Sequence, residues 1–177
     1  MKSPRTEMTT NGVGTRIWYQ DGKIHRGDGP ACIGSFGEEF WYQDGERHRL
    51  DGPAIIHSNG WKEWYQNDKL HRVDGPAIIL TDGSEGWYRH GKRHRLDGPA
   101  VTFVDGRVEW YRDGKAHKLD GPAITHRNGS QEWWVDGRKI NIDEWMAKHD
   151  TPAWPNWTKA DIVLFILTFA GAQEIPS

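Results

Sequence analysis

Histidine, arginine and aspartate recur together in one short motif, and they are the residues best equipped for chemistry. In residues 41–54, WYQDGERHRLDGPA, His48 and Arg49 stand just before Asp51. A histidine near a carboxylate can exchange protons as acid and base, and clustered histidines can bind Zn²⁺. The same pair of a cation and an aspartate recurs in five copies of the motif, as Arg26/Asp28, Arg49/Asp51, Arg72/Asp74, Arg95/Asp97 and Lys118/Asp120.

The regular repetition of this motif favours a structural role over catalysis. A tryptophan returns every 23 residues without insertion, at Trp18, Trp41, Trp64, Trp87, Trp110 and Trp133. A fixed period of about 20–50 residues is typical of repeat architectures. Successive repeats would stand ~10 Å apart, so the histidines of neighbouring repeats cannot share one metal ion. We therefore expect no catalytic residue, no metal site and no cofactor.

Each repeat reads as a β-hairpin followed by a connector. Residues 54–57, AIIH, are rich in β-branched side chains, and SNG supplies a turn. Residues 62–66, KEWYQ, alternate polar and aromatic side chains as a half-buried strand does. A second turn, usually Asp-Gly, leads into the connector HRxDGPA. The fold class predicted is all-β: a solenoid of antiparallel β-hairpins in one elongated twisted sheet.

The repeat also predicts which side chains are buried. Trp64 and Tyr65 are adjacent and should point to opposite faces of a strand. Small alanines follow the connector prolines and indicate close packing. One position is apolar in every repeat, which includes Cys32 and predicts that this cysteine is a small buried hydrophobe. Its members are Cys32, Ile55, Ile78, Val101 and Ile124.

The motif WYxxGKxHRxDGPA resembles the MORN-type repeat, which also runs 23 residues. GKIHRGDGPA, GKRHRLDGPA and GKAHKLDGPA match it at the Gly-Lys-x-His positions beginning at Gly22, Gly91 and Gly114. Arginine or lysine follows the histidine where the ordinary repeat has glycine, as in the variant of bacterial and phage proteins. The resemblance covers residues 14–138. It implies a hairpin solenoid used for binding or scaffolding and no defined activity.

The C-terminal residues depart from the repeat and predict a helical cap. Residues 142–149, IDEWMAKH, have helical character, and TKADIVLFILTFAG begins with a capping box of Thr158 and Asp161 and ends at Gly171. The second helix is apolar, so it should either fold over the sheet as a lid, which we favour, or join two copies as a homodimer. The predicted organisation is a flexible N-terminus over 1–13, repeats over 14–138 and a helical cap over 139–177.

Composition limits the classes of partner and location. The formal charge is -2 in 177 residues, which gives no general affinity for nucleic acid. The longest apolar run, residues 162–167, is far shorter than the ~20 residues of a membrane span. The N-terminus lacks the apolar region of a secretory signal, and the single cysteine allows no internal disulfide. We expect a cytoplasmic protein, in the host cytoplasm if it is encoded by a phage.

Basic residues concentrate where the repeats differ, and they form our predicted ligand site. Arg47 and Arg93 replace the apolar Ile24 and Leu70 of other repeats. Arginine beside an aromatic ring suits a nucleotide, because the ring stacks on the base and the guanidinium binds phosphate. Cations on exposed strands also prevent sheets from associating, which is the alternative explanation. The predicted ligand-binding residues are Arg47, His48, Arg49, Arg89, Arg93, His94, Arg95, Trp64, Trp87 and Tyr88.

These features favour a non-catalytic binding protein. The partner would be a host protein or a small anionic nucleotide-like ligand, and the phage-like resemblance suggests a counter-defence protein that binds a host factor or an immune signal. A purely structural or scaffold protein is the main alternative. A nucleotide-cleaving enzyme with histidine–aspartate chemistry is the third hypothesis.

Overall fold

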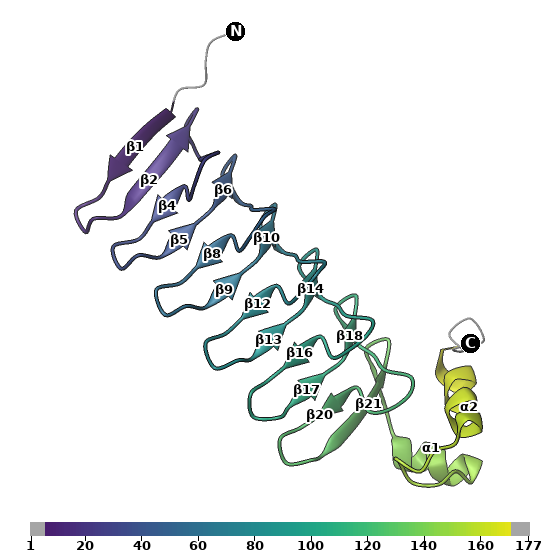
Figure 1. Ribbon diagram of the computed structural model, residues 1–177. Helices are drawn as coiled ribbons and strands as arrows, with labels where there is room; N and C mark the ends of the chain where they lie inside the picture. Colours follow the sequence, from purple (N-terminus) through teal and green to yellow (C-terminus); the bar gives the residue numbers. More distant parts are fainter. Residues whose placement is uncertain (1–5, 171–177) are drawn as a thin grey trace. The chain divides into compact units, whose positions relative to one another are not determined.

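The computed structural model describes residues 6–170. The chain divides into two compact units, Met1–Lys92 and Arg93–Ser177. Both units are built from short antiparallel strands, and the second also carries two helices (Figure 1). The predicted all-β hairpin repeat with a helical C-terminal segment is confirmed.

The first unit carries the first repeats of the chain. In it the strands of the larger sheet follow the order β1-β2-β4-β5-β8-β9-β12-β13, with β3 paired to β2, and the hairpins β6–β7 and β10–β11 pair separately. The strands are β1 (Thr6–Thr10), β2 (Arg16–Gln20), β3 (Lys23–Ile24), β4 (Cys32–Ile33), β5 (Glu39–Phe40), β6 (Tyr42–Gln43), β7 (Glu46–Arg47), β8 (Ile55–Ile56), β9 (Lys62–Glu63), β10 (Tyr65–Gln66), β11 (Lys69–Leu70), β12 (Ile78–Ile79), β13 (Glu85–Gly86) and β14 (Tyr88–Arg89).

The second unit carries the remaining repeats and the helices. Its larger sheet has the order β16-β17-β20-β21-β22, and β18–β19 form a separate hairpin. Its elements are β16 (Val101–Thr102), β17 (Val108–Glu109), β18 (Tyr111–Arg112), β19 (Lys115–Ala116), β20 (Ile124–Thr125), β21 (Gln131–Val135), β22 (Arg138–Ile140), α1 (Ile142–His149) and α2 (Lys159–Phe169). The short strand β15 (Lys92–Arg93) lies at the junction of the two units.

One repeat supplies two strands to the larger sheet and a projecting two-stranded hairpin. Strands β8, β9 and β12 lie side by side, with Ile55 paired to Glu63 and Glu63 paired to Ile78 (Figure 1). The strand predicted over residues 62–66 is interrupted at Trp64. The Trp64 N–H donates to the Ala77 carbonyl, and the Trp64 carbonyl accepts from the His71 N–H. Both backbone groups of Trp64 are therefore bonded to the connector and not to a neighbouring strand. The repeat is therefore bent at its tryptophan.

The hairpin turns use left-handed backbone, as the Asp-Gly pairs predict. Asp44 has φ 52° and Gly45 has φ 90°, and the unusual pair Asn67-Asp68 has φ 49° and 58°. Two consecutive positive φ values are the mark of a type I′ turn, whose twist matches that of the strands.

The small residues of each repeat are its most completely buried ones. The connector alanines Ala31, Ala54, Ala77, Ala100 and Ala123 are each 0% exposed. This confirms the close packing predicted for the alanine positions. Ile55, Val101 and Ile124 are buried as predicted, whereas Cys32 is only half-buried. Partial burial raises the pKa of the Cys32 thiol, with a smaller contribution from the Glu38 carboxylate.

Part of the N-terminal segment predicted to be flexible forms a strand. Residues 6–10 make β1, which pairs antiparallel with β2 from Thr6↔Gln20 to Thr10↔Arg16. The segment therefore covers the edge of β2, because an unpaired strand edge would leave backbone N–H and C=O groups without partners.

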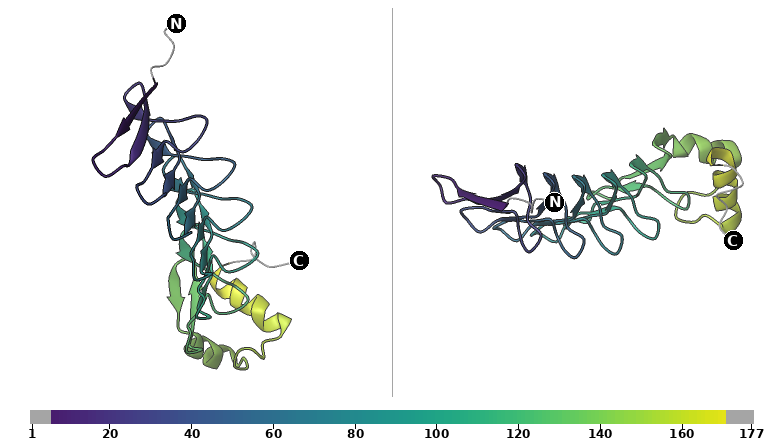
Figure 2. Two further views of the ribbon diagram at one scale, coloured as in Figure 1. Left: turned by 60° about the vertical axis from the view of Figure 1, so that its left-hand side comes forward. Right: turned by 90° about the horizontal axis from the view of Figure 1, so that it is seen from above.

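The C-terminal helices and the last hairpin share a large apolar cluster in the second unit. Helix α1 spans the predicted residues, and α2 begins with the predicted capping box, in which Asp161 accepts from the Thr158 N–H at 2.7 Å. Figure 2 shows both helices beyond the last hairpin, β21–β22. The predicted helix end at Gly171 lies outside the described residues.

Helix α2 packs on the last hairpin of its own unit through Phe165. This side chain is 0% exposed and clusters with Trp133, Trp145 and Trp157. The predicted lid is thus restricted, within the second unit, to the final hairpin. The outer side of α2 leaves Leu167 48% exposed, and dimerisation through this helix stays a prediction.

Candidate binding site: the connector grooves

Each connector is organised by its cation, which is an arginine in all but the last. In the second connector, Arg49 Nε donates to Asp51 Oδ1 at 2.9 Å and Nη1 donates to the Pro53 carbonyl at 3.3 Å. Its guanidinium carbon lies 4.0 Å from the ring centroid of Trp41, in a cation–π contact. The equivalent contacts are Arg26 over Trp18 at 4.3 Å, Arg72 over Trp64 at 4.2 Å and Lys118 over Trp110 at 4.2 Å. This is the structural role predicted for the HRxDG motif.

The glycine of the connector leaves room for the arginine. A Cβ added at Gly52 would lie 2.9 Å from the Arg49 guanidinium carbon, which is closer than such atoms approach. The same holds at Gly75, where an added Cβ would lie 2.7 Å from the Arg72 guanidinium carbon. Gly52 and Gly75 do not have a positive φ, so the packing of the arginine, and not backbone strain, favours glycine at these positions.

The connector carboxylates are exposed but bonded to their own arginines. The Asp51 side chain is 83% exposed, and the hydrogen bond from Arg49 lowers the pKa of its carboxyl. Asp28, Asp74 and Asp97 have the same arrangement, with pKa values lowered first by the arginine hydrogen bond. Each of these four connectors thus carries a compensated pair of charges, and its carboxylate stays ionised at neutral pH.

The repeated histidines link each repeat to the next. The Asp44 N–H donates to His25 Nδ1 at 3.0 Å, and the His90 N–H donates to His71 Nδ1 at 3.1 Å. In the second unit the Asp136 N–H donates to His117 Nδ1 at 3.1 Å. These histidines accept from the hairpin turn of the following repeat. They consequently hold the left-handed turns in place.

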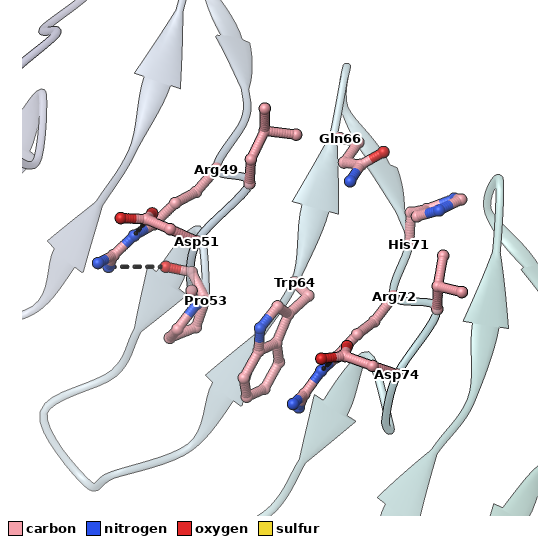
Figure 3. A pocket seen from close by; sticks show the side chains of 11 residues that line it. Arg49, Asp51, Pro53, Trp64, Gln66, His71, Arg72 and Asp74 are labelled. Atoms are coloured by element: carbon pink, nitrogen blue, oxygen red, sulfur yellow. Dashed lines mark hydrogen bonds and ion pairs between the residues drawn. The ribbon is translucent and has the colours of Figure 1, made fainter.

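Successive connectors of the first unit enclose a groove of ≈ 550 Å³. One wall is the second connector, with Arg49, Leu50 and Pro53, and the other is the third, with Arg72 and Val73. Trp64 lies between these walls, as Figure 3 shows. Leu50 is 76% and Val73 81% exposed, so apolar side chains stand at the mouth of the groove.

An equivalent groove lies one repeat earlier. It also measures ≈ 550 Å³, and it is lined by the first and second connectors together with Trp41, Tyr42 and His48. The volumes fall within the range of about 300–1,000 Å³ that is usual for ligand sites in proteins. The groove is therefore a property of the repeat.

The predicted basic patch does not form one surface in the first unit. Arg49 and Trp64 line the groove, and His48 Nδ1 lies 2.8 Å from Asn67 Oδ1. Arg47 instead lies over the ring of Tyr65 at 4.1 Å and donates to Asp68 Oδ1 at 2.6 Å. Trp64 lines the groove, whereas neither Arg47 nor Tyr65 does.

The Tyr65 hydroxyl is part of a buried polar cluster. It donates to Glu63 Oε2 at 2.8 Å, and His57 Nε2 lies 2.9 Å from Glu63 Oε1. Burial, followed by the hydrogen bond to Glu63, raises the pKa of Tyr65 to about 12. The hydrogen bond from Arg47 lowers the pKa of Asp68. Arg47 is thus compensated by Asp68, which stands where other repeats have the turn glycine.

The predicted site residues of the second unit also form hydrogen bonds within the protein. Arg93 Nη1 donates to Glu109 Oε2 at 3.1 Å, and Glu109 is 1% exposed and also paired with Arg107. The Asp113 N–H donates to His94 Nδ1 at 3.2 Å, and Arg95 Nε donates to Asp97 Oδ1 at 3.0 Å.

The remaining predicted residues belong to the fourth repeat. Trp87 and Tyr88 are half-buried, and Arg89 is exposed at the end of β14. An added Cβ at Gly86 would lie 2.9 Å from the Tyr88 ring, so this ring fills the space above the glycine.

The sequence interpretation missed the apolar residues of the groove and the buried glutamates. Leu50 and Val73 occupy the variable position of HRxDG, and an apolar residue at that position among polar neighbours was the available signal. Glu63 and Glu109 precede the repeated tryptophans and pair with Ile55 and Val101 across the sheet. Such glutamates look like solvent-facing strand residues until their long-range partners are known.

In comparisons with known proteins, no family model and no curated protein sequence matches the chain. Neither helix in the described part of the chain has the length and apolar character that crossing a bilayer requires. Within residues 6–170, no group of three or more His, Cys, Asp or Glu side chains could hold a metal ion.

Proposed function

We propose that this protein is a non-catalytic MORN-type repeat protein that binds a partner protein along its connector grooves. The observation that carries the proposal is the recurrence of one groove at successive connectors, with Leu50 exposed at the mouth of both grooves and Val73 at the mouth of one. Apolar side chains exposed at regular intervals beside polar groups are typical of protein interaction sites. A repeated groove can hold successive residues of an extended partner segment.

A partner protein is better supported than an anionic nucleotide. The arginines that would bind phosphate already donate to their own aspartates, and the aspartates are exposed at the groove rim. An incoming phosphate would have to displace these carboxylates and would also be repelled by them. An uncharged or cationic segment meets no such obstacle.

A selection from a library of displayed random peptides, with the full-length protein as bait, tests the proposal. Selected peptides should lose at least tenfold in affinity for the double variant Leu50→Asp, Val73→Asp. Phe36→Asp is the matched control, because Phe36 is 82% exposed on a hairpin turn of the same unit and should leave binding unchanged. Equal affinity for the groove variant and the wild type would overturn the proposal.

The nucleotide hypothesis has a separate test in the same protein. A ligand at a hundredfold excess over its Kd stabilises a protein by about 2.7 kcal/mol, which thermal melting detects. A panel of cyclic and linear nucleotides should therefore leave the melting temperature unchanged. A shift that disappears in Arg49→Gln would establish an anion site in place of a peptide groove.

A further inference from the structure

The last connector of the chain shows what fits such a groove. Three repeats after Leu50, Gly52 and Trp64 stand Leu119, Gly121 and Trp133. This final position has no following connector, because the repeat motif ends at β22. The C-terminal segment of the same unit covers it instead.

Trp154 occupies the equivalent of the groove at this last connector. A Cβ added at Gly121 would lie 3.2 Å from Cζ2 of Trp154, whereas Gly52 lines an open groove. The Trp154 ring also meets Trp133 edge to face, with ring centroids 5.4 Å apart. The indole thus rests between the connector glycine and the repeated tryptophan.

The exposure of the side chain at the variable connector position agrees with the presence of the Trp154 indole at the last connector. Leu119 is half-buried and packs against the cluster that contains Trp133 and Trp154. Its equivalents Leu50 and Val73 are 76% and 81% exposed. The same apolar position is therefore covered where an indole is present and exposed where none is.

We propose that the open grooves of the first unit bind tryptophan side chains presented by an extended, proline-bounded segment of the partner protein. This inference rests on the proposed function and specifies the chemistry of the partner. Trp154 itself lies in such a segment, Pro152-Ala-Trp-Pro155. Proline on both sides limits the conformations that the segment loses on binding.

The chemistry of the groove matches an indole. Its walls offer apolar surface from Leu50, Pro53 and Val73, and its rim offers the exposed carboxylates Asp51 and Asp74. Tryptophan combines a large apolar body with a single N–H donor. The apolar ring can fill the groove while its N–H reaches a carboxylate at the rim.

The partner is a different protein and not a second copy. The chain's own proline-bounded tryptophan already packs on its own last connector. Trp157 of the same segment is buried and donates from Nε1 to the Pro152 carbonyl at 2.8 Å. Release of this segment would expose the cluster around Trp133, so it is not available for another molecule.

The test uses the ¹⁵N-labelled full-length protein and the peptide Ac-PAWPN-NH₂, which has the sequence of residues 152–156. Millimolar peptide should shift the amide signals of Gly52 and Gly29, which line the two grooves, and leave that of Gly37, on a distant turn, unchanged. The alanine analogue Ac-PAAPN-NH₂ should have no effect. The double variant Leu50→Asp, Val73→Asp should reduce the response at least tenfold.

The outcomes separate this inference from the proposed function. If the tryptophan peptide causes no shift while library-selected peptides without tryptophan shift the Gly52 and Gly29 signals, the inference is overturned and the binding function stands. If no peptide of either kind shifts them, both fail. If these signals instead move with the concentration of the protein alone, the occupant is a second copy and the inference is wrong.

Discussion

Trp64 in the first unit and Trp133 in the second hold equivalent positions in the repeat, but different side chains cover them. The guanidinium of Arg72 lies over Trp64 at 4.2 Å and is bonded to Asp74 and Pro76. Trp133 is met by Trp154, Trp157 and Phe165. The contact between a guanidinium and a tryptophan ring, which recurs in the inner repeats, is thus replaced in the last repeat by contacts with apolar rings.

This difference explains how a repeat protein can end. An inner repeat keeps a polar outer surface, because arginine both stacks on the ring and stays partly hydrated. The last repeat lacks a following connector and would leave a large apolar ring in water. Repeat arrays need atypical end units for this reason. Four predictions test the contrast, from the largest effect to the smallest.

Phe165→Ala should cause the largest loss of stability. Phe165 is 0% exposed at the centre of the cap, and truncation of such a phenylalanine costs about 3–5 kcal/mol. Urea unfolding followed by circular dichroism would measure the loss. Leu167→Ala on the same helix is the control and should cost less than about 1 kcal/mol, since Leu167 is largely exposed. Similar losses for both variants would show that the cap does not pack on the last hairpin as described.

Gly52→Ala should destabilise the inner repeats by about 1–3 kcal/mol, because the new methyl group would displace the Arg49 guanidinium. Gly27→Ala provides the matched control in the preceding connector. An added Cβ there meets nothing within 4 Å, so its effect should stay within about 1 kcal/mol and be favourable if anything. Equal effects in unfolding experiments would mean that arginine packing does not require the glycine.

Exchange of arginine and lysine should have a smaller effect of predictable sign. Lys118 stands naturally in the last connector and keeps the ring contact at 4.2 Å, but its Nζ is 3.9 Å from Asp120 Oδ1. Arg72→Lys should therefore cost less than about 1 kcal/mol, chiefly through the lost hydrogen bonds. Lys118→Arg should stabilise by a few tenths of a kcal/mol. Opposite signs from denaturant unfolding would refute the role assigned to the guanidinium.

The link made by His71 should make the first unit sensitive to acid, whereas the last hairpin has Ile140 at the equivalent position. Burial, followed by the neighbouring His90 and Arg89, lowers the pKa of His71. A lowered pKa means that the folded state binds fewer protons than the unfolded chain. The stabilisation is therefore complete above about pH 6.5 and is lost as the pH falls through the lowered value.

Unfolding at pH 7.5 and pH 5.5 would measure this loss. His90→Asp restores the residue found at the equivalent turns of other repeats and should raise the pKa of His71, which NMR titration would follow. The variant should lose less stability on acidification than the wild type. An unchanged pH dependence would show that the pair His71–His90, with ring centroids 4.4 Å apart, is not responsible.

The repeat length, the strands and both helices could be predicted, because they depend on local patterns. The 23-residue period, the Asp-Gly turns and the Thr158–Asp161 capping box are read within a few residues of sequence. The bend at Trp64 was not predicted, since it results from backbone bonds to Ala77 in a later segment. Sequence periodicity alone cannot indicate which backbone groups will form hydrogen bonds with a connector further along the chain.

The binding site could be predicted only in part. Arg49 and Trp64 do line a groove, but Arg47 and Arg93 are held by Asp68 and Glu109, which lie 21 and 16 residues further along the chain. A count of basic residues therefore overestimates the charge available to a ligand. The exposed apolar residues of the connectors define the groove, and their exposure depends on the absence of a covering segment.

Opening the last groove tests most directly whether it is equivalent to the others. In the variant Trp154→Ala the position above Gly121 would be vacant, while the buried Trp157 and Phe165 still hold the cap. With ¹⁵N-labelled protein, Ac-PAWPN-NH₂ should then shift the Gly121 amide signal as it shifts those of Gly52 and Gly29, and it should leave Gly121 unaffected in the wild type. If the Gly121 signal of the folded variant does not respond, the last connector and the inner grooves are not the same kind of site, and the account is contradicted.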